Sequence, residues 1–153
     1  MGCFKSMTGS LHKIKQLSPR EVWLLLQALF LLPLVVLGLR LKPFKSMQST
    51  LTNRLPAGHV SVDGNALSQA HIIAGMVRAA SVHGLCNATC LPQSLLLWFL
   101  LRRHRIGGDL RFGVHKTETR LDAHAWVEVD GVPINDTQDV QKRYTPLTTN
   151  TNN

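Results

Sequence analysis

The feature that most constrains this chain is a run of apolar residues at positions 95–101, which contains no polar residue. Pro92, just before the run, is tolerated only in the first turn of a helix, so the helix is predicted to begin near Cys90. The arginines before His104 suit the negative C-terminal end of a helix, and two glycines soon afterwards stop it. A helix that is apolar on every side must be central and buried. The other elements are therefore expected to pack around residues 90–104.

Local signals predict two more helices and three strands. Ser18 is a helix N-cap, Pro19 is the first helical residue, and Glu21 completes a capping box. The predicted elements are an apolar helix to residue 41, a basic connector at 42–56, a helix at 65–82, and strands at 109–114, 123–129 and 132–137. Helices followed by a small antiparallel sheet define an α+β fold.

Length and composition narrow the possibilities further. A chain of 153 residues fits one domain, or a small domain with an N-terminal extension. The predicted divisions are 1–17, a loosely ordered basic N-terminus; 18–56, an apolar helix and connector; 57–147, the main domain; and 148–153, a polar tail. The net charge of +8 favours an anionic partner such as an acidic peptide, a membrane surface or nucleic acid. Three cysteines without a cleavable signal peptide indicate a reducing compartment.

Residues 22–41 are apolar except for Gln27 and Arg40, and they allow two interpretations. A run of about twenty apolar residues can span a bilayer. Pro33 in mid-run and the polar Gln27 favour instead a helix that docks on the domain or lies on a membrane surface. One side of that helix would carry Trp23, Leu26, Phe30, Pro33 and Leu37. We prefer the second interpretation, and expect a cytoplasmic protein able to contact a membrane surface through residues 18–42.

Cys90 is the candidate nucleophile because of its predicted place at the start of the buried helix. Free backbone N–H groups and the positive end of the helix dipole favour a thiolate there. The same N–H groups can donate to an oxyanion that forms on an attacked carbonyl. A small buried cysteine is the commoner case, so Cys90 alone does not define a site.

A hairpin later in the chain supplies candidate partners for this thiol. With a three-residue loop at 129–131, Gly131 takes the left-handed position of a bulge turn. His124 then faces Asp136 at about 5 Å on the same side of the hairpin. A two-residue turn at Asp130 and Gly131 would instead place Asp136 on the opposite face. The hypothesis of a Cys–His–Asp triad is therefore predicted to require the longer loop.

The three side chains would share the work of covalent catalysis. His124 would take the proton from Cys90 and later give it to the leaving amine, while Asp136 fixes the tautomer of the imidazole. Trp126 and Glu128 are predicted on the same face as His124 and are candidate substrate contacts. Core packing of the tryptophan and solvent exposure of the glutamate are the alternatives.

Several sequence blocks, in this order, resemble the lasso-peptide maturation peptidases, the transglutaminase-like B proteins of lasso-peptide clusters. The blocks are Cys-Leu-Pro-Gln-Ser-Leu at 90–95, Leu-Leu-Arg-Arg at 100–103, Leu-Arg-Phe-Gly-Val at 110–114 and His-Ala-Trp-Val-Glu at 124–128. The likeness is strongest from residue 84 to 136. It implies a transglutaminase-like, papain-like cysteine peptidase domain over residues 57–147. The family's nucleophile, histidine and aspartate fall on Cys90, His124 and Asp136.

This resemblance implies removal of the leader peptide from a ribosomally made precursor in bacterial antibiotic biosynthesis. It also implies a separate leader-recognition protein, since the segment before residue 65 is too short and too apolar to be a recognition domain. An asparagine-synthetase-like cyclase would then close the macrolactam ring with ATP. No phosphate-binding loop is visible, so no nucleotide or other cofactor is expected on this chain.

Other functions remain open on the sequence alone. The chain could be another transglutaminase-like peptide amidase or protease, or a non-catalytic, membrane-associated peptide-binding module. A zinc site using Cys86 and Cys90 is disfavoured because zinc ligand pairs are usually more closely spaced. No metal is therefore expected. The arginines near His104 suit the helix dipole, so nucleic acid is not expected to bind either.

Overall fold

The computed structural model describes residues 18–53, 65–84, 88–116 and 120–147. The helices are α1 (Pro19–Leu41), α2 (Phe44–Thr52), α3 (Ala66–His83), α4 (Cys90–Arg103) and α5 (Val140–Arg143). The strands are β1 (Asp109–Lys116), β2 (Leu121–Val129), β3 (Val132–Pro133) and β4 (Thr145–Leu147). They form one antiparallel sheet in the order β3-β2-β1-β4. The predicted α+β class, with helices followed by a small antiparallel sheet, is confirmed.

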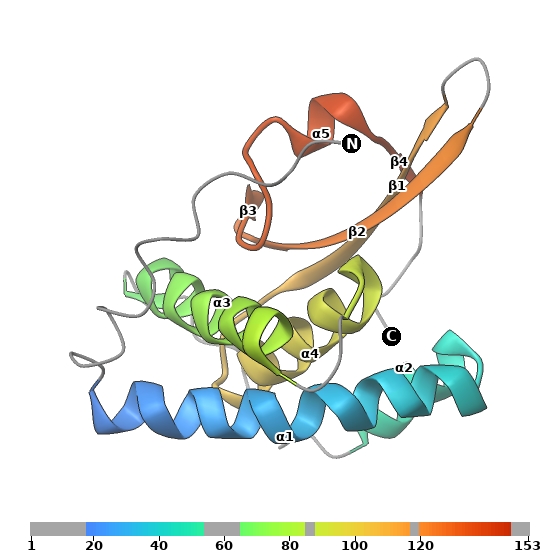
Figure 1. The fold of residues 1–153 in the computed structure, drawn as a ribbon. Helices are drawn as coiled ribbons and strands as arrows, with labels where there is room; N and C mark the ends of the chain where they lie inside the picture. The colour runs from blue at the N-terminus through green and yellow to red at the C-terminus, as the bar shows by residue number, and fades with distance from the viewer. Residues whose placement is uncertain (1–17, 54–64, 85–87, 117–119, 148–153) are drawn as a thin grey trace.

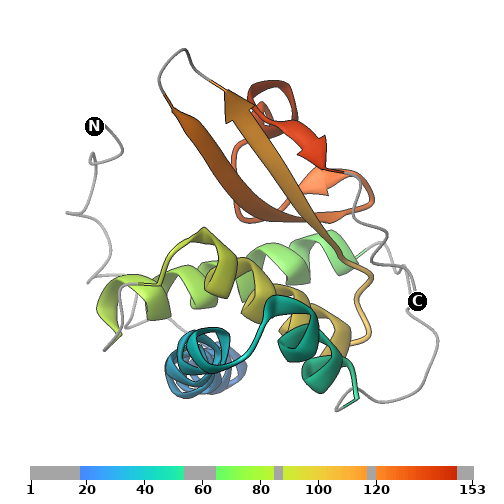
Figure 2. The same ribbon diagram turned by 90° about the vertical axis from the view of Figure 1, so that its right-hand side faces the viewer.

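The elements lie in three layers, which the two views of the ribbon show from perpendicular directions (Figures 1 and 2). The sheet with α5 forms one outer layer, α3 and α4 form the middle, and α1 with α2 forms the other outer layer. Helix α4 is central, because it packs against α1, α2, α3, β1 and β2. Its residues Leu95 to Leu101 are all buried, as the apolar sequence predicts.

Helix α1 begins as predicted and belongs to the same core. The hydroxyl of Ser18 accepts a hydrogen bond from the Glu21 amide, and the Glu21 carboxylate accepts one from the Ser18 amide. Ala28, Leu32 and Val35 of α1 are buried against the middle layer. The hydrophobic core therefore contains residues on both sides of the domain boundary that is predicted at residue 56.

The prediction that residues 42–56 form a connector is wrong for residues 44–52, which form α2. Phe44, Met47 and Leu51 pack against the core from one side of this helix. The ring of Phe44 also meets the ring of Phe112 on β1 edge to face, at 5.2 Å between centroids. The basic and polar residues that suggested a connector are the solvent side of a short amphipathic helix.

The hairpin between β2 and β3 also differs from its prediction. Val129 pairs with Val132, so the loop is the two-residue turn of Asp130 and Gly131 rather than three residues. Both turn residues have positive φ, 51° and 77°, which is the geometry that joins two strands directly. Strand pairing ends after Val132–Pro133, whereas the sequence predicts a strand to residue 137. This early end of β3 decides how the candidate site is formed.

Candidate active site

Cys90 lies at the first position of α4, after the N-cap Thr89, and its thiol is free and half-buried. Pro92 follows within the first turn, where its missing N–H costs no hydrogen bond. The helix thus points its unpaired backbone amides and its positive dipole end at the residue that carries the sulfur. This is the placement that the sequence predicts for Cys90.

His124 and Asp136 meet beside Cys90. Nε2 of His124 forms a short hydrogen bond with Oδ2 of Asp136, and the imidazole also hydrogen-bonds to the Cys90 thiol. The other carboxylate oxygen of Asp136 accepts from the Thr137 amide at 2.7 Å and from an Arg143 NH2 group at 3.0 Å. The structure therefore brings together all three side chains that the sequence singles out.

The contact forms even though the hairpin has the shorter turn, so the predicted requirement for a three-residue loop is wrong. The Ile134 amide still donates to the Val127 carbonyl, at 2.9 Å. The chain leaves the strand at the next residue, Asn135, because here the Val127 amide donates its hydrogen bond to the side-chain oxygen of Asn135, at 2.8 Å, and not to a backbone carbonyl. The bend at residues 134–136 turns Asp136 back toward His124.

The electrostatics of the three groups favour a charged pair of cysteine and histidine. The hydrogen bond from His124 lowers the pKa of Cys90 below its ordinary value, against the opposing effect of burial. Hydrogen bonding to Cys90 raises the pKa of His124, and Asp136 adds to that rise. Burial would raise the pKa of Asp136, but the Thr137 amide and His124 outweigh it and lower it. A thiolate beside an imidazolium is thus stabilised.

Backbone amides next to the sulfur reinforce this state. Hydrogen bonds from the amides of Ala125 and Leu91 also lower the pKa of the Cys90 thiol. Ala125 directly follows His124 on β2, whereas Leu91 is the second residue of α4. The two elements that meet at the site therefore both direct N–H groups at the same atom.

A buried hydrogen-bond network joins the elements that carry the three side chains. The hydroxyl of Ser94 on α4 donates to the Ala125 carbonyl on β2 at 2.8 Å. The Asn135 amide nitrogen donates to the same hydroxyl at 2.8 Å, while its oxygen accepts from the Val127 amide. Ser94 is fully buried, so no water replaces these bonds. Four residues thereby tie the start of α4 to β2 and to the segment before Asp136.

Ser94→Ala is expected to reduce the free energy of unfolding by about 1–3 kcal/mol, because it leaves buried polar groups of this network unpaired. Ser81→Ala is the matched control, since Ser81 is also buried but its hydroxyl donates to the Arg78 carbonyl of its own helix. That control should change stability by no more than about 0.5 kcal/mol. Urea unfolding followed by circular dichroism measures both. Equal losses in the two variants would show that the network contributes nothing of its own.

Two aromatic side chains stack on the ring of His124, and the sequence did not predict the contact of one of them, Tyr144. Tyr144 stacks on His124 at 4.9 Å between ring centroids, and Trp126 stacks on it at 6.1 Å. Gly113 pairs with His124 across the sheet, and a Cβ there would come within 2.7 Å of Tyr144 and 2.9 Å of Trp126. The glycine therefore gives these rings room to pack. A lone tyrosine far from the motifs offered no sequence signal.

Trp126 and Glu128, the two predicted substrate contacts, lie inside the protein. Trp126 is 1% exposed and its indole N–H donates to Glu128 at 2.7 Å. Glu128 is 6% exposed and also accepts hydrogen bonds from Arg111 and Gln141. The alternative of core packing fits the tryptophan, but the glutamate is not solvent-exposed as its alternative supposed. Both residues support the sheet behind His124, and neither is accessible enough to be proposed as a substrate contact.

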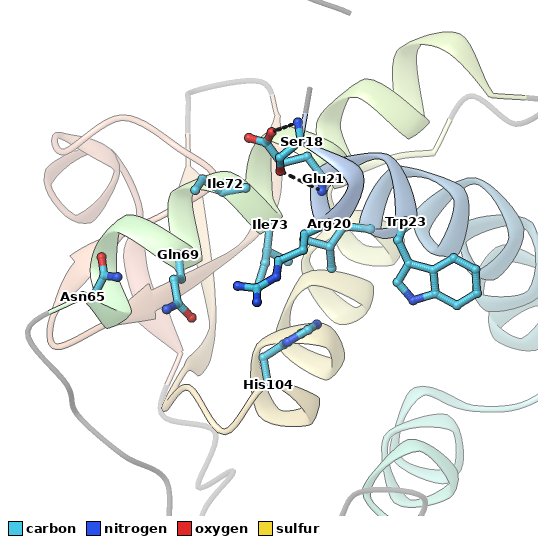
Figure 3. Close-up of a pocket in the computed structure, with 10 residues that line it drawn as sticks. Ser18, Arg20, Glu21, Trp23, Asn65, Gln69, Ile72, Ile73 and His104 are labelled. Atoms are coloured by element: carbon cyan, nitrogen blue, oxygen red, sulfur yellow. Dashed lines mark hydrogen bonds between the residues drawn. The ribbon is translucent and has the colours of Figure 1, made fainter. Parts of the chain in front are cut away.

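A cavity of about 610 Å³ lies at the opposite end of α4 from Cys90, between the starts of α1 and α3 (Figure 3). Its lining residues are Ser18, Arg20, Glu21, Trp23, Leu24, Asn65, Gln69, Ile72, Ile73 and His104. Burial, followed by the charge of Arg103, lowers the pKa of His104 at its edge. None of the three candidate catalytic residues lines this cavity. Among the described residues, no cluster of histidine, cysteine and carboxylate side chains is arranged to hold a metal ion.

The fold and the site together define a class of protein. The site contains a free cysteine at the start of a buried helix. This cysteine is hydrogen-bonded to a histidine, which is in turn hydrogen-bonded to a carboxylate, and such an arrangement is typical of cysteine hydrolases. The model of the Transglutaminase-like superfamily matches residues 29–149, most of the chain, and the chain belongs to this superfamily. Its members are generally cysteine-protease-like, which supports peptidase- or amidase-like activity. Searches of curated proteins and of solved structures found no match.

Proposed function

We propose that this protein is a cysteine peptidase in which Cys90 is the nucleophile, His124 the general acid and base, and Asp136 the residue that orients His124. The observation that carries the proposal is the continuous hydrogen-bonded arrangement of these three side chains at the start of α4. Membership of the transglutaminase-like superfamily supports it independently.

The proposed reaction has two halves. The Cys90 thiolate attacks the carbonyl carbon of a peptide bond, and amides beside the sulfur, such as that of Leu91, are placed to donate to the developing oxyanion. His124 then protonates the leaving amine as the C–N bond breaks, which leaves a thioester on Cys90. In the second half, His124 takes a proton from water, which attacks the thioester. The carboxylic acid is released and the thiol is restored.

The substrate that the resemblance supports is a lasso-peptide precursor, from which this enzyme would remove the leader peptide. The proposed partners are that precursor, a separate leader-recognition protein and an asparagine-synthetase-like cyclase, in the cytoplasm of a bacterium. The alternative function is another transglutaminase-like amidase or protease reaction, in which the same three residues would act on a different peptide. In a peptidase, water attacks the thioester, whereas in amide transfer an amine attacks it. The nature of this second attacking group therefore distinguishes the two reactions.

The test is incubation of the wild-type protein with the cognate precursor and the recognition protein, followed by intact mass spectrometry. We expect a single cleavage, with a free carboxylic acid at the end of the released leader. Samples that also contain a primary amine should give the same acid. Conversion to an amide product would favour amide transfer. An unchanged precursor, with reaction of an unrelated peptide instead, would favour the alternative protease.

A further inference from the structure

One side of α1 is covered by no part of the structure that is described. It carries large apolar side chains that are 42–74% exposed: Val22, Trp23, Leu26, Phe30, Leu34, Leu37 and Leu41. We call this set the outer face of α1. It includes Trp23, Leu26, Phe30 and Leu37, four of the residues that the sequence places on one side of this helix. An apolar surface of this extent is uncommon on an isolated soluble domain and marks a contact site.

The opposite side of the same helix excludes a simple membrane span. Helix α1 has 23 residues and a mean hydropathy of 2.5, so it could cross a bilayer by length and composition. Ala28, Leu32 and Val35, however, are buried against α3 and α4 in the common core. A span would have to remove these residues from the core and expose the apolar surface beneath them. The folded structure is therefore compatible with α1 lying along a surface and not with α1 crossing a bilayer.

The polar groups around the outer face distinguish a lipid surface from a protein partner. Protein interfaces have a polar rim and about one hydrogen bond per 100–200 Å². Between Glu21 and Arg40, the only polar residue in α1 is Gln27, so the face has few groups able to make such bonds. The acyl region of a bilayer needs none. The helix extends for about 35 Å, long enough to lie in the plane of a membrane.

Positive charge lies at both ends of this apolar face. Arg20 stands at the start of α1, and Arg40, Lys42 and Lys45 gather at its end, all exposed. The carboxylate of Glu21 is held by the capping box, and no ion pair joins a described acidic residue to these four basic ones. Basic groups that flank an apolar helix face fit the headgroup layer of an anionic membrane.

The position of α1 is compatible with activity at such a surface. Figure 1 shows α1 on one side of the molecule and the sheet on the other, with α3 and α4 between them. We propose that the outer face of α1 docks this protein in the plane of an anionic membrane surface, with the Cys90 site facing away from the lipid. The proposal rests on packing and charge, and does not depend on the proposed peptidase activity.

Binding to lipid vesicles tests this directly, with Trp23 as the reporter. Trp98 and Trp126 are 2% and 1% exposed, whereas Trp23 is 63% exposed, so a vesicle should change mainly the emission of Trp23. The full-length protein should sediment with vesicles of phosphatidylcholine and phosphatidylglycerol, and its fluorescence should shift to the blue. Vesicles of phosphatidylcholine alone should bind it more weakly, because they lack the anionic charge.

The variant Leu26→Gln, Phe30→Gln and Leu37→Gln should bind anionic vesicles at least about ten-fold more weakly than wild type. These three positions are exposed and glutamine is a good helix former, so the fold should persist. The matched control also removes three exposed apolar side chains: Ile72→Gln, Val82→Gln and Leu121→Gln. This control, and Cys90→Ala, should bind like wild type.

Three outcomes would overturn the proposal. The first is failure of wild type to bind anionic vesicles, or equal binding by all the variants. The second is a wild-type oligomer that the α1 variant converts to a monomer without vesicle binding, which would assign the face to a second copy. The third is retention of bacterially expressed protein in the membrane after carbonate extraction, which would indicate a span. Release by carbonate supports docking in the membrane plane.

Discussion

Replacing Cys90 with alanine is expected to reduce cleavage of the cognate precursor by at least about 10⁴-fold. No other described side chain next to His124 can form the thioester, so the variant lacks the bond-forming group itself. Alanine keeps a small apolar residue at the first position of α4, and the fold should be unaffected. Initial rates from mass spectrometry of the released leader measure the effect.

The control for this variant is Cys3→Ala, which removes another of the three cysteines and should leave the rate unchanged. Iodoacetamide at neutral pH supplies a second readout without a substrate. It should modify Cys90 faster than an ordinary cysteine, since the hydrogen bond from His124 lowers the pKa of this thiol and so increases its thiolate fraction. Equal cleavage by wild type and by Cys90→Ala would remove Cys90 from the mechanism and favour a non-catalytic binding module.

Replacing Asp136 with asparagine is expected to lower the cleavage rate by about 10²–10⁴-fold. The amide is similar in size but carries no charge, so it no longer raises the pKa of His124. A less stable imidazolium stabilises the neighbouring thiolate less, and the pKa of Cys90 should move back up toward its ordinary value. The rise of alkylation rate with pH should therefore shift to higher pH in this variant.

Asp139→Asn is the matched control, because Asp139 is an exposed carboxylate on the same segment and also pairs with Arg143. It should retain the wild-type pH profile and a rate within about three-fold of wild type. An Asp136→Asn variant with the same pH profile as wild type would show that this carboxylate does not act through His124. Loss of activity in both variants would instead indicate a general need for an ordered segment at 136–143.

Several elements could be predicted from the sequence because their signals are local. The apolar run before the arginines and the position of Pro92 predict α4, its burial and the place of Cys90 at its start. The capping box predicts the start of α1 to the residue. In each case, residues within a few positions of one another carry the free energy that decides the conformation.

The candidate site was predicted less securely, since it depends on contacts between distant segments. The sequence singled out His124 and Asp136 through a hairpin register that the structure does not have. Their contact forms because Asn135 replaces a strand hydrogen bond and bends the chain, in a network with Ser94 on α4. No pattern within the hairpin encodes this bond, because its partner lies 41 residues away in sequence.

Two further features were decided by tertiary structure for the same physical reason. Alternation along β2 places Glu128 on the face of His124, but only packing with Trp126, Arg111 and Gln141 buries it. Hydropathy is similar on all sides of α1, so it does not identify which side packs inward. The sequence alone determined the α+β class, the buried helix and the candidate nucleophile. The folded chain determined how the Asp136 carboxylate reaches the histidine, and which side of α1 is left uncovered.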